Sequence, residues 1–207
     1  MISKKLTLNS ESRRPDEARE LAQDFARGIG LDHRDTLRLS LLMEETLGMV
    51  GALVEDFYGQ VWLNGDAAHC ELHLQATASM DAERRRELVQ VSSSGRNAAK
   101  GFMGMLGDVF MGALHGLSRT LDAYGRETAR FGVVHTEGMG GAAVDEMSLI
   151  WTLSAYRDGL DTYRDKDQEA EQAWDELEKS IVASLADEVT VGVRGDCIEM
   201  VIVKDFM

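Results

Sequence analysis

Cysteine is scarce in this 207-residue sequence, and no HExxH zinc motif is present. The two cysteines, Cys70 and Cys197, lie far apart in strand-like segments, and the five histidines do not form a metalloprotease signature. This pattern does not match the ligand spacing of a structural zinc site or a zinc hydrolase. We therefore expect two reduced cysteines, histidines in structural or surface roles, and no metal site.

Basic residues are also in short supply. Lysine and arginine number 22 against 36 acidic residues, which gives a formal net charge of −14 at pH 7. Nucleic acids and anionic lipid surfaces would repel such a chain. The charge balance predicts that neither nucleic acid nor a membrane is the main partner.

Long hydrophobic runs are missing as well. The opening residues, MISKKLTLNS, contain no apolar stretch of signal-peptide length, and the longest apolar segment, 102–117, is interrupted by Asp108 and His115. Segments of this kind are too short or too polar for a secretion signal or a membrane-spanning helix. We expect a cytoplasmic protein.

Two periodicities alternate along the chain and predict a mixed α+β fold. Alternation of polar and apolar residues predicts strands, and apolar residues spaced three and four apart predict helices. We expect strand 147–156, for which a helix is the alternative, and a polar connection at 158–167. The remaining predicted elements are strand 4–9, helix 15–27, helix 37–55, hairpin 60–64 with 69–77, a short charged helix 81–91, an apolar helix from 96 to about 124, helix 169–186 and hairpin 189–193 with 197–204. Grouped helices favour a mostly antiparallel sheet covered on one face.

The stretch 37–54, LRLSLLMEETLGMVGALV, has the most informative pattern. Glu44 and Glu45 lie in the middle of an apolar helix and have no cation within four residues on either side. A carboxylate is costly to bury without a partner, so at least one of them should face water or a site. A solvated edge of an amphipathic helix would satisfy the same pattern.

This helix resembles the first motif helix of the GHKL superfamily, the Bergerat ATP-binding fold of gyrase, histidine kinases and anti-sigma-factor serine kinases. The family pattern is Glu, three residues, Asn; here Glu45 matches the Glu, and Met49 takes the Asn position. The segment GIGL at 28–31 and the closing LADEVTVGVRGDCIEMVIVKDF are also similar to the anti-sigma-factor kinases. The resemblance covers about half of the chain. It implies a single domain, 1–207, that forms a two-layer α/β sandwich, with 80–168 as an inserted, mainly helical segment.

The resemblance also shows which nucleotide-binding groups are replaced. It implies Glu45 as the general base of an active relative. The family's metal-holding Asn is Met49, its adenine-reading Asp is Ala76, and the Gly two residues later is Ala78. The glycine-rich phosphate turn should precede Ile181, where the sequence is LEKS. A candidate ligand cleft would therefore be lined by Glu44, Glu45, Met49, Ala76 and Ala78, without a magnesium ligand.

A second candidate anion site is the segment SSSGRNAAKG at 92–101. Ser94, Gly95, Arg96 and Lys100 stand at the expected start of a helix, where free N–H groups and the helix dipole favour anions. The order is not that of a P-loop. A helix cap with a solvated charged first turn would explain the same residues without a ligand.

These observations lead to three hypotheses. The first is a regulatory protein-binding module with a degraded nucleotide site, a pseudokinase or pseudo-ATPase that requires no cofactor and contacts a partner or a second copy through the Met-rich helix 101–124. The second is an ATP- and Mg-dependent serine kinase or ATPase with Glu45 as base and a site rebuilt from 92–100 or from a lid at 138–141. The third is a small-molecule sensor that uses the old nucleotide cleft.

Overall fold

The computed structural model describes residues 1–9, 14–53, 58–77, 133–136, 148–166, 168–194 and 197–206. Within these ranges the chain forms five helices and one seven-stranded sheet. The predicted helices at 81–91 and 96–124 lie outside the described residues. In chain order the elements are β1 (Leu6–Asn9), α1 (Pro15–Ile29), α2 (His33–Leu53), β2 (Tyr58–Gly65), β3 (His69–Thr77), β4 (Val133–Thr136), β5 (Ser148–Thr152), α6 (Leu153–Tyr163), α7 (Gln168–Lys179), α8 (Ile181–Leu185), β6 (Glu188–Arg194) and β7 (Cys197–Asp205).

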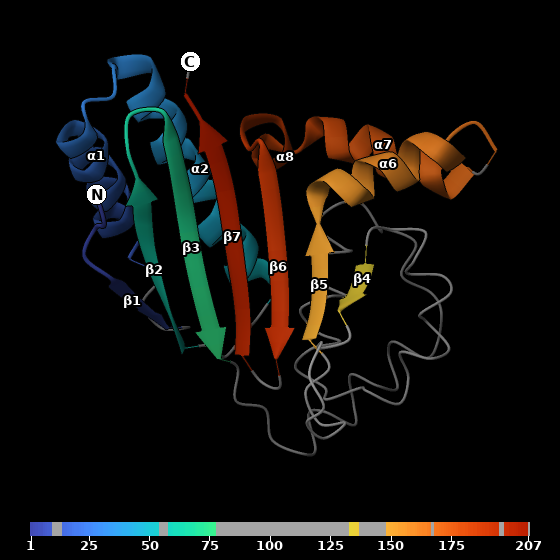
Figure 1. Ribbon diagram of the computed structural model, residues 1–207, viewed down its shortest axis with the longest axis horizontal. Helices are drawn as coiled ribbons and strands as arrows, with labels where there is room; N and C mark the ends of the chain where they lie inside the picture. Colours follow the sequence, from blue (N-terminus) through green and yellow to red (C-terminus); the bar gives the residue numbers. More distant parts are fainter. Residues whose placement is uncertain are drawn as a thin grey trace.

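The sheet has the strand order β1-β2-β3-β7-β6-β5-β4, and every neighbouring pair is antiparallel. The two predicted hairpins are confirmed, and they are joined through β3 and β7, where Leu72 pairs with Ile202 and Leu74 with Met200. Figure 1 shows the first and last strands of the chain in one sheet, with α1 and α2 behind it. The predicted α+β class is therefore confirmed.

One face of the sheet forms the hydrophobic core. Val61 and Leu63 of β2 and Leu72 and Leu74 of β3 are at most 1% exposed, and Trp151 of β5 and alternate residues of β6 and β7 are buried with them. The intervening residues of β2 and β3 are more exposed and mostly polar. This alternation is the pattern of an antiparallel sheet that packs on one side only.

Helices α1 and α2 begin and end at residues that the sequence marks clearly. Gly30 ends α1 with a φ of 82°, a left-handed conformation that glycine adopts without strain. Asp32 caps α2, because its Oδ1 accepts a hydrogen bond from the Asp35 backbone N–H at 2.8 Å. The structure thus confirms the predicted helix pair, and the two helices pack against each other.

The prediction was wrong between residues 153 and 163. The expected strand 147–156 ends at Thr152, and the segment 158–167, predicted as a polar connection, belongs mostly to α6. Thr152 caps α6 by accepting a hydrogen bond from the Ala155 N–H at 3.3 Å. Tyr156 and Leu160 are buried at helical spacing among polar residues. These two apolar positions provide the packing that stabilises the helix.

The predicted helix 169–186 is two helices. Helix α7 ends at Lys179 and α8 begins at Ile181. Ser180 has an extended backbone, and its side chain caps α8 by accepting a hydrogen bond from the Ala183 N–H. The Arg157 guanidinium donates to the Ala183 carbonyl and so ties α6 to α8. A serine that competes for backbone donors ends the first helix and starts the second.

Two glycines should respond to alanine in opposite ways. At Gly65, φ is 144° and an added Cβ would lie 2.1 Å from the His69 carbonyl oxygen, so Gly65→Ala should destabilise the fold by roughly 3 kcal/mol. In α2, a Cβ added at Gly48 would meet no atom within 4 Å beyond its own stretch of helix backbone, so Gly48→Ala should stabilise by up to about 1 kcal/mol. Urea unfolding of both variants measures the effects. Equal effects would contradict the described hairpin geometry.

Candidate functional site

Helix α2 has one buried face and one exposed face. Leu39, Leu42, Met43 and Leu47 are buried in the core cluster, and Thr46 is fully buried with its hydroxyl donating to the Leu42 carbonyl at 2.7 Å. The opposite face exposes Leu37 and Leu41. Glu44 and Glu45 lie at the boundary between the two faces and are half-buried. The helix therefore presents both candidate carboxylates at its rim.

Glu44 has a structural partner from another helix. Arg19 of α1 donates from its Nε to Glu44 Oε1, and the same guanidinium lies 3.5 Å from Asp16. This ion pair links α1 to α2. Arg19 lies 25 positions from Glu44, so a search for cations within four residues of the carboxylate could not find this partner.

Glu45 differs from its neighbour. Among the described residues it has neither a hydrogen bond nor an ion pair, and its side chain is half-buried. A carboxylate in this position can accept a proton or a hydrogen bond from a molecule that approaches the rim of α2. Within the described part of the chain, Glu45 is thus the predicted site residue whose carboxylate has no hydrogen-bond or ion-pair partner and could bind a ligand.

Ala76, at the predicted adenine-reading position, lies in a tightly packed part of the sheet. It is 3% exposed and pairs with Gly59 on one side and Ile198 on the other. A Cβ added at Gly59 would lie 3.3 Å from the Ala76 Cβ and 2.7 Å from the Gln75 carbonyl oxygen. Ala76 also belongs to the same core cluster as Leu42 of α2. Apolar side chains therefore fill the described interface between α2 and the sheet.

The helix start at residue 181, where the resemblance predicts a phosphate-binding turn, is a serine-capped helix start. Leu177 is buried, and Ser180 provides the cap of the five-residue α8. Without glycines the backbone cannot form a wide loop of inward N–H groups around a phosphate. Ser180 therefore marks the boundary between α7 and α8.

Several predicted site residues lie outside the part of the chain that can be described. Met49 belongs to α2, and of it only the backbone is described. Ala78, the possible lid at 138–141 and the Met-rich segment 101–124 are outside the described residues, as is the candidate anion site of Ser94, Gly95, Arg96 and Lys100. The structure therefore brings together Glu44, Glu45 and the backbone of Met49 on one helix, and it places Ala76 in the core on which that helix packs.

A stacked cluster on the polar face of the sheet was not predicted. The rings of Trp62 and His73 are stacked at 5.0 Å with an interplanar angle of 2°, and Lys5 Nζ lies 4.1 Å from the Trp62 ring. His73 Nε2 lies 3.0 Å from Glu71 Oε2, which also accepts from Asn64 at 3.1 Å. Alternation in HCELH could have revealed that His69, Glu71 and His73 share a face.

His69 forms the second part of this cluster. Its Nδ1–H donates to Asp205 Oδ1 at 2.7 Å, and its Nε2 lies 3.7 Å from Glu71. The hydrogen bond to Asp205 raises the pKa of His69 above its ordinary value of 6.5. The hydrogen bond from His73 lowers the pKa of Glu71. The His69–Asp205 hydrogen bond therefore joins β3 to β7 on the side opposite the core, and the Asn64–Glu71 hydrogen bond joins β2 to β3.

His69 and His73 have HxxxH spacing, but on a strand rather than on a helix. The Cα atoms of residues four apart on a strand are separated by roughly 13 Å, so two such histidines do not converge on one ion as they would on a helix. Within the described residues no group of three His, Cys, Asp or Glu side chains is placed to hold a metal. The side chains of this cluster link neighbouring strands of the sheet through hydrogen bonds.

Stability should depend on the His69–Asp205 pair in a defined pH window. Because the folded pKa is raised, the pair stabilises fully below about pH 6.5, and the stabilisation is lost as pH rises through the folded pKa. Asp205→Asn should lower the His69 pKa toward 6.5 and flatten this dependence. NMR titration of the imidazole measures it, with Glu199→Gln as a control on β7. A His69 pKa that does not respond to Asp205→Asn would refute the pairing.

The chain matches no protein-family model, and neither curated proteins nor solved structures give a significant match. Among the described helices, none combines the length and the apolar character needed to cross a membrane. Functional inference for this chain therefore depends on its own residues and their geometry.

Proposed function

We propose that this chain is a regulatory protein-binding module built on a GHKL-like scaffold that no longer binds nucleotide. The order of elements supports this proposal: a strand, two helices, a hairpin, and a closing hairpin that shares one sheet with the first. The scaffold would be a degenerate Bergerat-type sandwich of the anti-sigma-factor or histidine-kinase kind. Its activity would be binding and not catalysis.

The observation that carries the proposal is the buried Ala76. At this position the family's carboxylate would accept a hydrogen bond from the adenine amino group, an interaction worth roughly 1.5 to 3 kcal/mol. Ala76 offers only a methyl group, packed against neighbouring strands. Losing the carboxylate alone should weaken binding about tenfold to more than a hundredfold.

Two further replacements act in the same direction. A thioether such as that of Met49 is a poor ligand for magnesium, which prefers hard oxygen donors. Ser180 caps a short helix where the family has a glycine-rich phosphate turn. Because the three replacements affect adenine, metal and phosphate separately, their costs should accumulate.

The regulatory contact is proposed for the Met-rich segment 101–124, which could engage a partner or a second copy of the chain. Methionine side chains adapt to irregular apolar surfaces, and glycines allow close approach of two helices. Sedimentation of the full chain tests the self-association form of this proposal. A strict monomer whose segment 101–124 is protected from limited proteolysis would contradict it.

Calorimetric titration with ATP and magnesium tests the loss of nucleotide binding. We expect no saturable heat up to millimolar nucleotide for the wild type. Glu45→Gln serves as the matched variant, because it removes a general base but leaves the binding contacts unchanged. Saturable, magnesium-dependent heat in both proteins, with hydrolysis in the wild type only, would overturn the proposal in favour of an ATPase or serine kinase.

Restoring a carboxylate at position 76 should destabilise the fold. A charged aspartate would be buried without a partner, so Ala76→Asp should cost roughly 3 kcal/mol at pH 7, and less as the pH approaches 4 and the acid becomes neutral. Thr77→Asp, at the neighbouring exposed position, should cost less than about 1 kcal/mol. Denaturant unfolding at both pH values measures the difference. A tolerated Ala76→Asp would indicate an open, hydrated cleft.

A further inference from the structure

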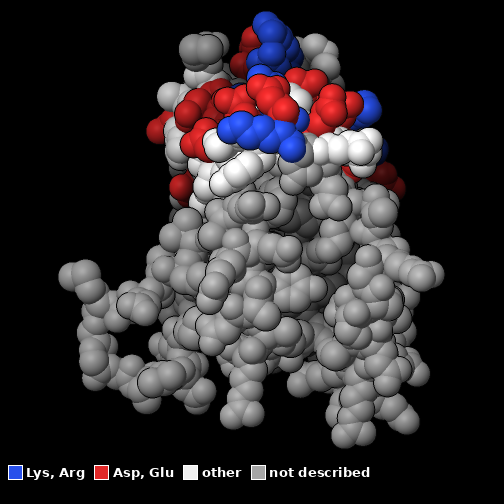
Figure 2. Space-filling model, turned by 90° about the vertical axis from the view of Figure 1, so that its right-hand side faces the viewer, with Lys and Arg blue, Asp and Glu red and all other residues white. Residues whose placement is uncertain are grey.

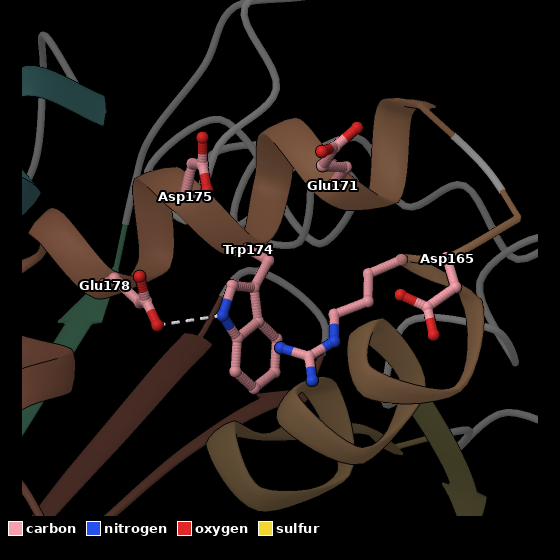
Figure 3. A pocket seen from close by; sticks show the side chains of 6 residues that line it. Asp165, Glu171, Trp174, Asp175 and Glu178 are labelled. Atoms are coloured by element: carbon pink, nitrogen blue, oxygen red, sulfur yellow. Dashed lines mark hydrogen bonds between the residues drawn. The ribbon is translucent and has the colours of Figure 1, made fainter.

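A groove of about 350 Å³ lies between α7 and the turn that follows α6, and it contains an aromatic ring. Figure 3 shows the indole of Trp174 projecting from α7 toward α6, with Glu178 beside its nitrogen. The Trp174 Nε1–H donates to Glu178 Oε1 at 2.9 Å, which fixes the plane of the ring. The groove is lined by Arg164, Asp165, Glu171, Trp174, Asp175 and Glu178.

The Trp174 ring already holds a cation from its own chain. The Arg164 guanidinium lies 4.7 Å from the centre of the ring. Arg164 also pairs with Asp161 at 3.1 Å, and both side chains are exposed, at 42% and 61%. Exposed pairs of this kind contribute at most about 1 kcal/mol, so Arg164 can leave the ring at low cost. The group on the ring shows that a guanidinium fits this position.

The charge around the groove favours binding of a cationic group. Four of the six lining residues are acidic and one is basic. Segment 153–179 contains nine acidic and four basic residues. Figure 2 shows the described part of this end of the molecule, where acidic side chains outnumber the basic ones between them. A second copy of a chain with a net charge of −14 would be repelled here.

We propose that the groove docks an arginine from a basic segment of a partner protein, which displaces Arg164 from the face of Trp174. Arginine suits this position because its planar guanidinium stacks on the indole while its donors reach carboxylates such as Asp165 and Glu178. A lysine would use the charge but lose the planar stacking. This inference is independent of nucleotide binding, since the groove and the α2 rim involve different residues.

Fluorescence anisotropy of the full chain with a labelled peptide tests the proposal. The probe is a short alanine peptide with two arginines, and the same peptide with glutamine in place of arginine is the negative control. Arg164→Ala should tighten binding roughly two- to fivefold, because the internal competitor is removed. Arg34→Ala, an exposed substitution on α2 with the same change in charge, should leave affinity nearly unchanged. Trp174→Ala should weaken binding by at least the same factor.

A second pair of variants separates the groove from the overall negative charge. Glu171→Gln combined with Asp175→Asn should weaken binding several-fold, whereas Glu20→Gln combined with Glu199→Gln, exposed residues on other elements, should not. The proposal is overturned if Arg164→Ala fails to tighten binding, or if both double variants weaken it equally. If the chain binds spermine as tightly as the arginine peptide, and Trp174→Ala weakens both equally, the ligand of the groove is a free polyamine and the proposed protein partner is wrong.

Discussion

The packing of the apolar face of α2 against the buried face of the sheet determines most of the other features of this protein. Leu39, Leu42, Met43 and Leu47 are all buried in one cluster with the sheet residues. Full burial of each such side chain is worth roughly 1.5 to 3 kcal/mol, so rotating the helix out of this orientation would be very costly. The orientation in turn places Glu44 and Glu45 at the rim and brings Glu44 to Arg19.

The same packing limits what the region beneath α2 can bind. A nucleotide-binding cleft needs space and polar groups at the base of the sheet, and here Ala76 is buried in an apolar core cluster. Filling such a layer with methyl groups strengthens the fold while it removes hydrogen-bond partners for a ligand. Binding energy for partners would then come from the molecule's surfaces, including the acidic groove at Trp174.

The sequence predicted the elements whose patterns are local and regular. The α2 helix, the β2–β3 and β6–β7 hairpins and the opening strand follow from apolar periodicity together with caps such as Asp32 and Gly30. The prediction failed at α6, where the apolar positions Tyr156 and Leu160 are separated by charged residues and a single threonine cap decides where the strand stops. It also failed at Ser180, because one serine can stand inside a helix or begin a new one.

The candidate site could be predicted only in part. The position of Glu45 follows from the pattern of one helix. Ala76 was expected to line a ligand cleft, although the alternation along its strand already places it on the buried face with Leu72 and Leu74. Arg19 with Glu44 and Trp62 with His73 could not be found, because each pair joins separate elements and depends on the sheet register or on helix packing. Strand order itself, with β7 inserted between β3 and β6, is a long-range property that local periodicity does not contain.

The methyl resonance of Ala76 gives the most direct test of a scaffold without nucleotide binding. In a sample with labelled alanine methyl groups, this resonance should stay unchanged as ATP and magnesium are added to millimolar concentration. A saturable shift of the Ala76 methyl, dependent on magnesium, would show nucleotide entering the layer beneath α2 and would contradict the proposed loss of binding.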